Sequence, residues 1–275
     1  MQKDGLFNHR PLREYSQAVK YTMRLAAVAA SLFFTMVAGA TISFNTTKLT
    51  YYPAPDNNGR GIGILVVPGG GYSFVSLDNE GRSSTDYLNA KGYDAWVLDY
   101  STASTASTPL YPVPMEEALG AVNYIRSQSD VRLNKLGIWG YSAGGHLAAV
   151  TLTDPRADLD FGILGYPVIS MDEAITHQGS RDNLLGDHPS KKLVDEMSAE
   201  NRVTENTPPV FIYHSVDDET VPVQNALRFI GALMEKKRPY QALILPDAPH
   251  GIALGMDDPK RNWSPELDRF LTYSV

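Results

Sequence analysis

Gly140-Tyr141-Ser142-Ala143-Gly144 fits the pattern G-x-S-x-G and stands directly after a run typical of a buried strand, Leu136 to Trp139. The small, apolar residues from Gly144 to Val150 are typical of a helix that packs closely on a sheet. A serine on such a strand-to-helix turn is held in a strained backbone conformation with its hydroxyl exposed, and the flanking glycines give the turn room. The stretch therefore predicts that Ser142 is a nucleophile. The alternative is a glycine-rich turn that serves only helix packing.

A serine nucleophile needs a histidine to take its proton and a carboxylate to orient that histidine. His250 lies in Asp247-Ala248-Pro249-His250-Gly251, a loop that follows the strand-like run Ala242 to Leu245. Taken alone, a histidine in such a loop is more often a solvated residue. Its position after both the serine and an acidic motif matches the chain order Ser, Asp or Glu, His, and we therefore predict His250 as the base.

The carboxylate is expected in the segment His214-Ser215-Val216-Asp217-Asp218-Glu219-Thr220-Val221-Pro222. This segment follows the strand-like run Val210 to Tyr213, and open α/β sheets place their sites at the carboxyl ends of their strands. We favour Asp218 as the acid and keep Asp217 as the alternative, because residue type and spacing do not separate the two. An acidic turn that only caps the helix expected near Pro222 is the simpler interpretation.

Pro68-Gly69-Gly70-Gly71-Tyr72 follows directly on another buried run, Ile62 to Val67. Successive glycines let backbone N–H groups approach a substrate oxygen closely, and one such donor contributes roughly 3 to 4 kcal/mol of transition-state stabilisation. We predict an oxyanion hole with one donor from Gly70 or Gly71 and the other from the N–H of Ala143. A flexible loop or a phosphate cradle is the alternative, and no G-x-x-x-x-G-K-[ST] pattern supports a cradle.

With these motifs the chain resembles the α/β-hydrolase superfamily, and within it the small carbohydrate esterases that include acetylxylan esterases and bacterial feruloyl-esterase-like domains. The resemblance covers nearly everything from about Leu49 to the C-terminus. It implies that Asp218, which opens a D-x-x-V-P motif, is the acid. The segments that carry it are Pro68 to Tyr72, Gly140 to His146, Ser180 to Gly186, Asp218 to Pro222 and Pro249 to Gly251.

Two positions depart from the family pattern. Pro68 stands where lipase-type members carry a histidine, and this hardly affects chemistry that backbone groups perform. Ser101 follows Tyr100 where many relatives are expected to have arginine, which leaves the local packing and the rim of the pocket open.

Composition narrows the classes of function. The 275 residues, 43% of them hydrophobic, can bury one sizeable core. A formal net charge of −7 without a basic patch argues against nucleic-acid binding and favours a neutral or esterified substrate. Cysteine is absent, which excludes disulfides and thiolate metal sites, and no histidine pair has metal-ligand spacing. We expect catalysis without a metal or another cofactor, and leave the oligomeric state open.

Strand-like and helical runs alternate after residue 40, which predicts an α/β fold with a doubly wound, mostly parallel sheet and helices on both faces. Residues 41–52 and 61–67 flank the turn signal Asp56 to Gly59 and are predicted to pair as a hairpin at the sheet edge. Residues 167–201 are long for a connection and typical of a lid or binding loop, yet too short for a full cap domain. Helices are expected near 79–91, 114–127 and 264–271, and further strands near 94–100, 136, 161, 210 and 242.

The N-terminus predicts a targeting segment. Leu25 to Ala40 is apolar and small, and it ends in Ala38-Gly39-Ala40, the small-x-small pattern of a signal-peptidase site. The run is shorter than the roughly 20 apolar residues of a membrane span. We interpret residues 1–40 as a signal peptide, with Met23 as an alternative start, and residues 41–275 as a secreted or periplasmic catalytic domain without stable membrane association after cleavage. An uncleaved anchor or a surface helix is the alternative.

These patterns together predict a secreted serine esterase that hydrolyses short acyl esters, acetyl esters foremost, on small or polymeric carbohydrate substrates. Tyr72 and Tyr166 are candidates for stacking on a sugar, although aromatic residues at strand ends are more often part of the core. The alternatives are a peptidase, amidase or lactone hydrolase of the same fold, and an inactive carbohydrate-binding relative. The intact set of serine, acid, histidine and triple glycine argues against an inactive relative.

Overall fold

The computed structural model of the chain describes residues 41–44, 47–55, 59–129, 131 and 133–275. The targeting segment predicted for residues 1–40 lies outside the described residues.

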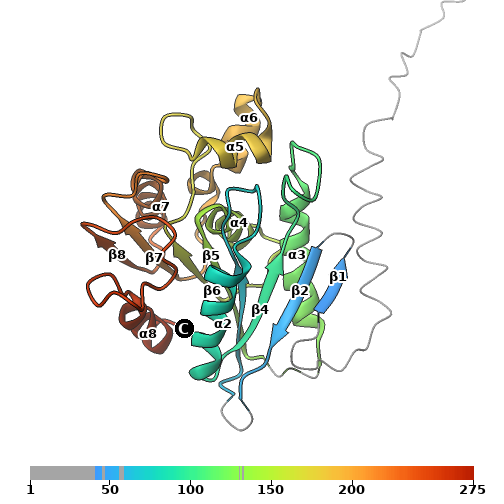
Figure 1. Cartoon of the computed structure of the whole chain (residues 1–275), viewed down its shortest axis with the longest axis vertical. Coiled ribbons are helices and arrows are strands. Elements are labelled where there is room, and N and C mark those ends of the chain that lie inside the picture. The colour runs from blue at the N-terminus through green and yellow to red at the C-terminus, as the bar shows by residue number, and fades with distance from the viewer. Residues whose placement is uncertain (1–40, 45–46, 56–58, 130, 132) are drawn as a thin grey trace, which may run out of the picture. The chain divides into compact units, whose positions relative to one another are not determined.

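An eight-stranded sheet with the strand order β1-β2-β4-β3-β5-β6-β7-β8 forms the centre of the described part of the chain (Figure 1). The two strands at one edge run antiparallel, and all pairs from β4 to β8 are parallel. This confirms the predicted doubly wound, mostly parallel sheet. The strands are β1 (Thr41–Phe44), β2 (Thr47–Tyr52), β3 (Ile62–Val67), β4 (Asp94–Asp99), β5 (Lys135–Tyr141), β6 (Phe161–Gly165), β7 (Val210–Ser215) and β8 (Tyr240–Leu245).

The predicted hairpin between residues 41–52 and 61–67 is wrong. Residues 41–52 form two strands that pair with each other, and β2 then pairs antiparallel with β4, where Leu49 lies opposite Leu98. β3 lies between β4 and β5 instead. The physical reason is burial: five of the six residues of β3 are buried, and a strand that is apolar on both faces is stable only inside a sheet covered by helices.

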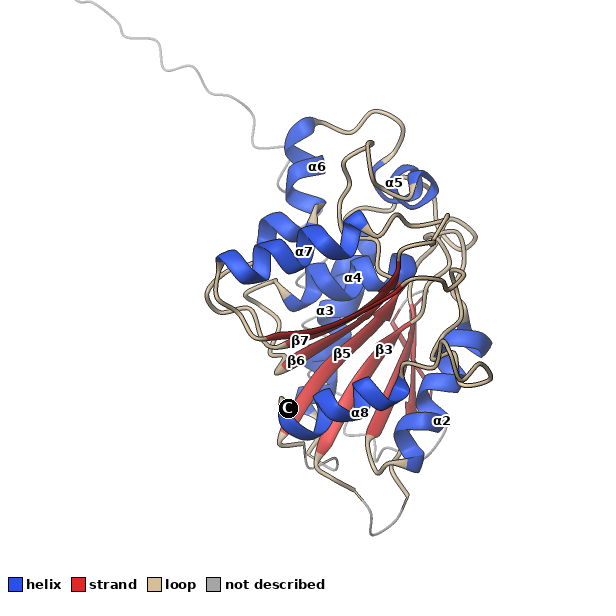
Figure 2. Ribbon diagram, turned by 90° about the vertical axis from the view of Figure 1, so that its left-hand side faces the viewer, coloured by secondary structure: helices blue, strands red, loops and turns tan. Residues whose placement is uncertain are grey.

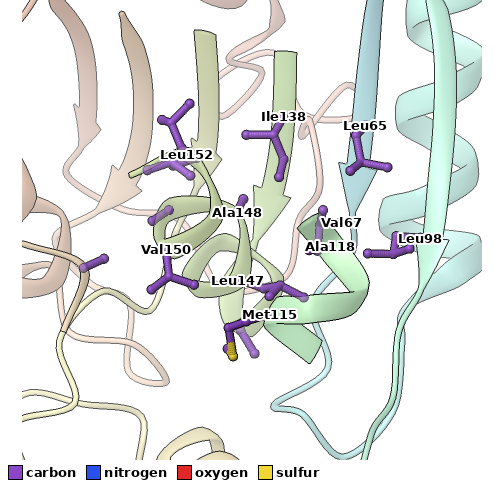
Figure 3. Close-up of a cluster of buried hydrophobic side chains, with 14 of the residues drawn as sticks. Leu65, Val67, Leu98, Met115, Ala118, Ile138, Leu147, Ala148, Val150 and Leu152 are labelled. Atoms are coloured by element: carbon purple, nitrogen blue, oxygen red, sulfur yellow. The ribbon is translucent and has the colours of Figure 1, made fainter. Parts of the chain in front are cut away.

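Helices cover both faces of the sheet, as expected for a parallel sheet (Figure 2). Side chains alternate between the faces, so Leu65 and Val67 join the core under α3, α4 and α7, and Ile64 and Val66 join the core under α2 and α8. Figure 3 shows the first of these cores, in which Leu65 and Ile138 of the sheet lie near Leu147 and Ala148 of α4. The helices are α2 (Ser83–Ala90), α3 (Val113–Ser127), α4 (Ser142–Leu152), α7 (Gln224–Glu235) and α8 (Ser264–Tyr273).

α4 is the central helix, and all of its residues are buried. Its amino terminus approaches the end of β3 so closely that a Cβ added to Gly144 would lie 2.2 Å from the carbonyl oxygens of Val67 and Pro68. Only glycine permits this contact. The glycine therefore brings Ser142, at the start of α4, beside the loop that follows β3.

Residues 167–201, expected to form a lid or binding loop, contain two short helices, α5 (Gln178–Leu185) and α6 (Lys191–Met197). α5 docks on the loop after β3, because Nδ2 of Asn183 donates hydrogen bonds to the Gly71 carbonyl and to Oγ of Ser73. The described part of the chain contains no separate cap domain. None of the described helices is long and apolar enough to cross a membrane.

His146, in the second turn of α4, is fully buried. Its Nε2 lies 2.7 Å from the carbonyl oxygen of Met197, and its Nδ1 lies 2.8 Å from the Tyr72 hydroxyl. Because a carbonyl only accepts, Nε2 carries the proton and Nδ1 accepts from Tyr72. Burial lowers the pKa of His146 to about 4, against the opposing effect of the bond to Met197. The neutral ring joins α4 to the loop after β3 and to the end of α6.

We predict that the free energy of unfolding falls as the pH is lowered from about 6.5 to about 4. In this window the unfolded chain binds a proton at His146 that the folded chain does not bind, so acid favours unfolding by an amount on the order of 3 kcal/mol. Denaturant titrations across this range should show a shallower pH slope for His146→Gln than for the wild type. His188→Gln, which changes an exposed histidine, should keep the wild-type slope. Equal slopes for His146→Gln and the wild type would contradict the prediction.

Candidate active site

Ser142 lies on the turn between β5 and α4, where the G-x-S-x-G motif places it. Tyr141 is extended, and Ser142 has a φ of 52°. This left-handed conformation is uncommon for a residue with a side chain and is typical of functional sites. A Cβ added to Gly69 would lie 2.8 Å from Cβ of Ser142, so a glycine is required where the loop after β3 passes the serine.

Asp218, His250 and Ser142 form a continuous hydrogen-bonded row. Nδ1 of His250 lies 2.7 Å from Oδ2 of Asp218, and Nε2 of His250 lies 2.8 Å from Oγ of Ser142. Because the carboxylate accepts, Nδ1 donates to it and Nε2 is left to accept the serine proton, which is the tautomer that a general base needs. Asp217, the alternative acid, is exposed, whereas the side chain of Asp218 is only 1% exposed.

The carboxylate of Asp218 is surrounded by donors. Burial alone would raise its pKa, but the nearby side chain of His214 and the hydrogen bonds from His250 and from the amide of Val221 lower the pKa well below its ordinary value. Oδ1 also accepts from the amides of Thr220 and Val221, both at 2.9 Å. Asp218 therefore stays ionised wherever a histidine titrates, and its charge can hold His250 in one orientation.

Gly70 and Gly71 lie in the loop after β3 and both have positive φ, 130° and 65°. Their carbonyl groups are engaged, by the amides of Ser73 and Phe74 and by Nδ2 of Asn183. Among the described residues, no protein group accepts a hydrogen bond from the two glycine amides. The amide of Ala143 lies in the first turn of α4, where N–H groups have no partner within the helix. The predicted oxyanion donors thus belong to the two segments that flank Ser142.

The expectation that Tyr72 and Tyr166 stack on a sugar is wrong for the structure described here, because the two residues are only 0% and 1% exposed. The hydroxyl of Tyr72 bonds to His146, as described above. The hydroxyl of Tyr166 donates to Oε1 of Glu80 at 2.8 Å and accepts from the amide of Ala253 at 2.9 Å. Both tyrosines pack inside the loops that carry the site, and neither presents a ring face to a substrate.

Tyr100 and Ser101, where the chain departs from the family pattern, are also buried. The Tyr100 hydroxyl donates to the Pro68 carbonyl at 2.8 Å, which fixes the first residue of the loop after β3. The amide and hydroxyl of Ser101 donate to Glu117 of α3 at 2.7 Å and 2.6 Å. Ser101 therefore belongs to the packing between β4 and α3 and not to an exposed rim.

Two further residues lie beside the glycines of the loop after β3. Phe74 is 57% exposed, and its Cδ2 is 3.2 Å from a Cβ added to Gly70. Cε1 of His177 is 3.5 Å from a Cβ added to Gly71. Nδ1 of His177 accepts from the Ser180 amide, so Nε2 carries the proton of the neutral ring. Burial and, to a smaller extent, the nearby His250 lower the pKa of His177.

Sequence reasoning missed Phe74 and His177, and it also missed Glu80, which contacts Tyr166. Phe74 stands three residues after the triple glycine, and this proximity is the one signal that could have pointed to it. Nothing in the sequence relates His177 or Glu80 to the serine, because tertiary packing brings them there. In the described residues, no cluster of three or more His, Asp or Glu side chains is placed to hold a metal ion.

Two family models match the chain. The model of the prolyl oligopeptidase family matches residues 110–274, and a model named BD-FAE matches residues 50–160. The first range contains Ser142, Asp218 and His250. The second contains the loop after β3 together with Ser142.

Two proteins with similar sequences have names that refer to xylan. An endo-1,4-beta-xylanase B of Butyrivibrio fibrisolvens is 37% identical over 217 residues, which make up 73% of this chain and 34% of that protein. An acetylxylan esterase of Xylanibacter ruminicola is 35% identical over 207 residues, 72% of this chain and 42% of that protein. The chain thus spans well under half the length of these two relatives.

Solved structures of similar fold extend the comparison. An acetyl ester-xyloside bifunctional hydrolase from Caldicellulosiruptor lactoaceticus superposes with a TM-score of 0.76 at 30% identity, over 85% of this chain and 96% of that one. A carboxylesterase from Lactobacillus plantarum, at a TM-score of 0.71 and 22% identity over 85% of this chain and 96% of that one, shares the fold. The family models, the sequence relatives and the arrangement of the sheet agree: the chain belongs to the α/β-hydrolase superfamily, and within it the chain is similar to carbohydrate esterases.

Proposed function

We propose that the chain is a serine-dependent esterase that removes short acyl groups, acetyl groups foremost, from carbohydrate. The observation that carries the proposal is the hydrogen-bonded row from Asp218 through His250 to Ser142, with distances of 2.7 Å and 2.8 Å. This row lies beside backbone amides without protein partners, the arrangement that acyl transfer requires.

In the proposed mechanism, Nε2 of His250 takes the proton of Ser142 while Oγ attacks the ester carbonyl. The N–H groups of Ala143 and of Gly70 or Gly71 hold the oxyanion of the tetrahedral intermediate. His250 then protonates the departing sugar alkoxide, which leaves an acyl group on Ser142. Water, deprotonated by His250, attacks this acyl-enzyme and releases the carboxylic acid, and the proton returns to Ser142.

The relatives support the choice of substrate class. An acetylxylan esterase and an acetyl ester-xyloside bifunctional hydrolase are among them; the first name refers to acetylxylan, and the second refers to acetyl esters and xylosides. The negative net charge of the chain, −7, suits an uncharged acylated sugar better than a polyanion.

A second candidate is cleavage of a peptide or amide bond. The observation that favours it is the match of residues 110–274 to the prolyl oligopeptidase family. The same serine row would serve both reactions, since both pass through an acyl-enzyme. An inactive, carbohydrate-binding role is disfavoured by the intact hydrogen-bonded row.

Export of the enzyme to the periplasm or medium is part of the proposal, and it rests on Ala38-Gly39-Ala40 at the end of the apolar run. Mass spectrometry of the exported protein should give a mature N-terminus near Thr41. An intact N-terminus before Leu25 would contradict export by this route.

We propose that Phe74, in place of Tyr72 and Tyr166, is the aromatic residue that stacks on the sugar. The residue is 57% exposed and its ring lies beside Gly70, so an apolar sugar face can pack on it while the ester reaches Ser142. His177, beside Gly71, has an Nε2–H that can donate to a sugar hydroxyl.

Replacement of Ser142 tests the chemistry. For Ser142→Ala we expect kcat on p-nitrophenyl acetate to fall roughly 10⁶-fold, because the nucleophile is lost. The full chain should release acetate from acetylated xylan and hydrolyse an ester faster than the matched amide. Serine-dependent amide cleavage at an equal or higher rate would favour the peptidase candidate, and wild-type turnover by Ser142→Ala would refute the mechanism.

Replacement of Asp218 should lower kcat far more than replacement of its neighbour Asp217. Asp218→Asn is expected to lower kcat on p-nitrophenyl acetate roughly 10⁴-fold, because an amide no longer stabilises the required tautomer of His250. Asp217→Asn is the matched control and should stay within about twofold of the wild type, since an exposed carboxylate contributes little. Similar losses in the two variants would contradict the assignment.

A polymer substrate tests the role of Phe74. For Phe74→Ala, the ratio of kcat/KM for acetylated xylan to that for p-nitrophenyl acetate should fall roughly five- to tenfold, because the sugar loses an apolar contact of about 1 kcal/mol. Met234→Ala removes a side chain of similar exposure, at 59%, from α7 and should keep the wild-type ratio. An unchanged ratio in Phe74→Ala would exclude the contact.

A further inference from the structure

Glu80 is a buried carboxylate that the proposed mechanism does not use. It lies in a single π-helical turn, residues Leu77–Arg82, directly before α2, and is 4% exposed. Such turns occur often at functional sites. A buried acid needs partners, because an unpaired charge away from water is strongly destabilising.

Both oxygens of Glu80 accept hydrogen bonds. The amide of Gly69 donates to Oε2 at 2.6 Å, and the hydroxyl of Tyr166 donates to Oε1 at 2.8 Å. The direction of the second bond follows from the amide of Ala253, which donates to the Tyr166 oxygen and so leaves the hydroxyl proton for Glu80. Two donors directed at the two oxygens are what an ionised carboxylate requires.

These bonds connect the two segments whose relative position decides catalysis. Gly69 directly precedes Gly70 and Gly71, the proposed oxyanion donors. Ala253 lies three residues after His250, and the Tyr166 ring meets the His250 ring edge-on with 4.8 Å between centroids. Glu80 thus lies in a chain of contacts that leads from the loop after β3 to the loop that carries His250.

The backbone along this chain is held in an uncommon conformation. Tyr166 and Ala253 have φ of 36° and 50°, and Ser142 has a φ of 52°. Non-glycine residues keep positive φ only where the surroundings enforce it. The hydrogen bond between Tyr166 and Ala253 joins two such residues, and Glu80 orients the hydroxyl that makes this bond.

Charge adds to the geometric role. Burial raises the pKa of Glu80 above its ordinary value, and the hydrogen bonds from Gly69 and Tyr166 and the nearby His250 only partly oppose this effect. The groups that face His250 are Asp218 at Nδ1, Ser142 at Nε2 and the Tyr166 ring, and the side chains of Glu80 and His177 lie at longer range. A second carboxylate near the imidazole favours its protonated form.

We propose that Glu80 is a positioning residue: it fixes the loop after β3 relative to His250, and its negative charge stabilises the imidazolium of His250 that forms during acyl transfer. The inference rests on the proposed function, because it assigns Glu80 a part in the reaction of Ser142.

Glu80→Gln tests both the positioning role and the charge role of Glu80, with the full chain and p-nitrophenyl acetate as the substrate. The amide group of glutamine has to face one of the two donors, so one bond is lost together with the charge. We expect kcat to fall 10- to 100-fold with KM within about threefold of the wild type. The acid limb of kcat/KM should move to lower pH, because removal of a negative charge makes the imidazolium less stable.

Tyr166→Phe is the matched variant, since it removes the link to Ala253 but leaves the charge of Glu80 and its bond to Gly69. It should lower kcat without moving the acid limb. In the double variant, the loss of kcat should be smaller than the product of the two single losses, because both changes break the same chain of contacts.

A Glu80→Gln protein with a lower melting temperature but with wild-type kcat and pH profile would overturn the proposal in favour of a purely structural role. If Glu80→Gln does not fold, Glu80→Asp decides instead, since it keeps the charge but is too short to reach both donors. A wild-type kcat for Glu80→Asp would overturn the positioning role. The proposed function fails separately, through wild-type turnover in Ser142→Ala.

Discussion

The close approach of α4 to the end of β3 sets the geometry of the whole site. Gly144 and Gly69 leave no room for a side chain at this contact, where added Cβ atoms would lie 2.2 Å from backbone oxygens and 2.8 Å from Cβ of Ser142. The contact sets the distance between Ser142 and the amides of the loop after β3. In the proposed reaction, stabilisation by backbone donors depends on positions within fractions of an ångström, so the packing of α4 also decides the geometry of the reaction at Ser142.

Buried polar groups hold the loops that this contact brings together. His146 is hydrogen-bonded to the loop after β3 and to the end of α6. Asp218 accepts hydrogen bonds within the segment after β7. Glu80, through Tyr166, connects the loop after β3 to the loop after β8. Each of the three side chains is buried, where an unmade hydrogen bond is costly, so each strongly favours one arrangement of its partners. The rigidity of the site therefore comes from satisfied polar groups between loops as much as from the apolar cores beneath.

Local signals predicted most of the fold, because hydrophobic runs and glycine motifs depend on neighbours in sequence. The runs around Val66, Ile138 and Ile212 are strands, and the chain order of serine, acid and histidine agrees with the hydrogen-bonded row. The failures have a common origin. The predicted hairpin between residues 41–52 and 61–67 does not account for the burial of β3 on both faces. Residue type does not show that Tyr72 and Tyr166 are buried, because their burial depends on distant segments. Phe74, His177 and Glu80 meet the glycine loop only through packing.

The strand-turn-helix around Ser142, the glycines that permit it and the chain order of serine, acid and histidine can be read from the sequence, since all of these are properties of short segments. The long-range packing of the chain is needed to show which of two adjacent aspartates contacts His250, which strand pairs with β2 and which acid is buried beneath the site. Adjacent side chains point in different directions, so a shift of one residue separates an exposed Asp217 from a buried Asp218. Such choices depend on contacts between segments far apart in the chain, and no local pattern contains them.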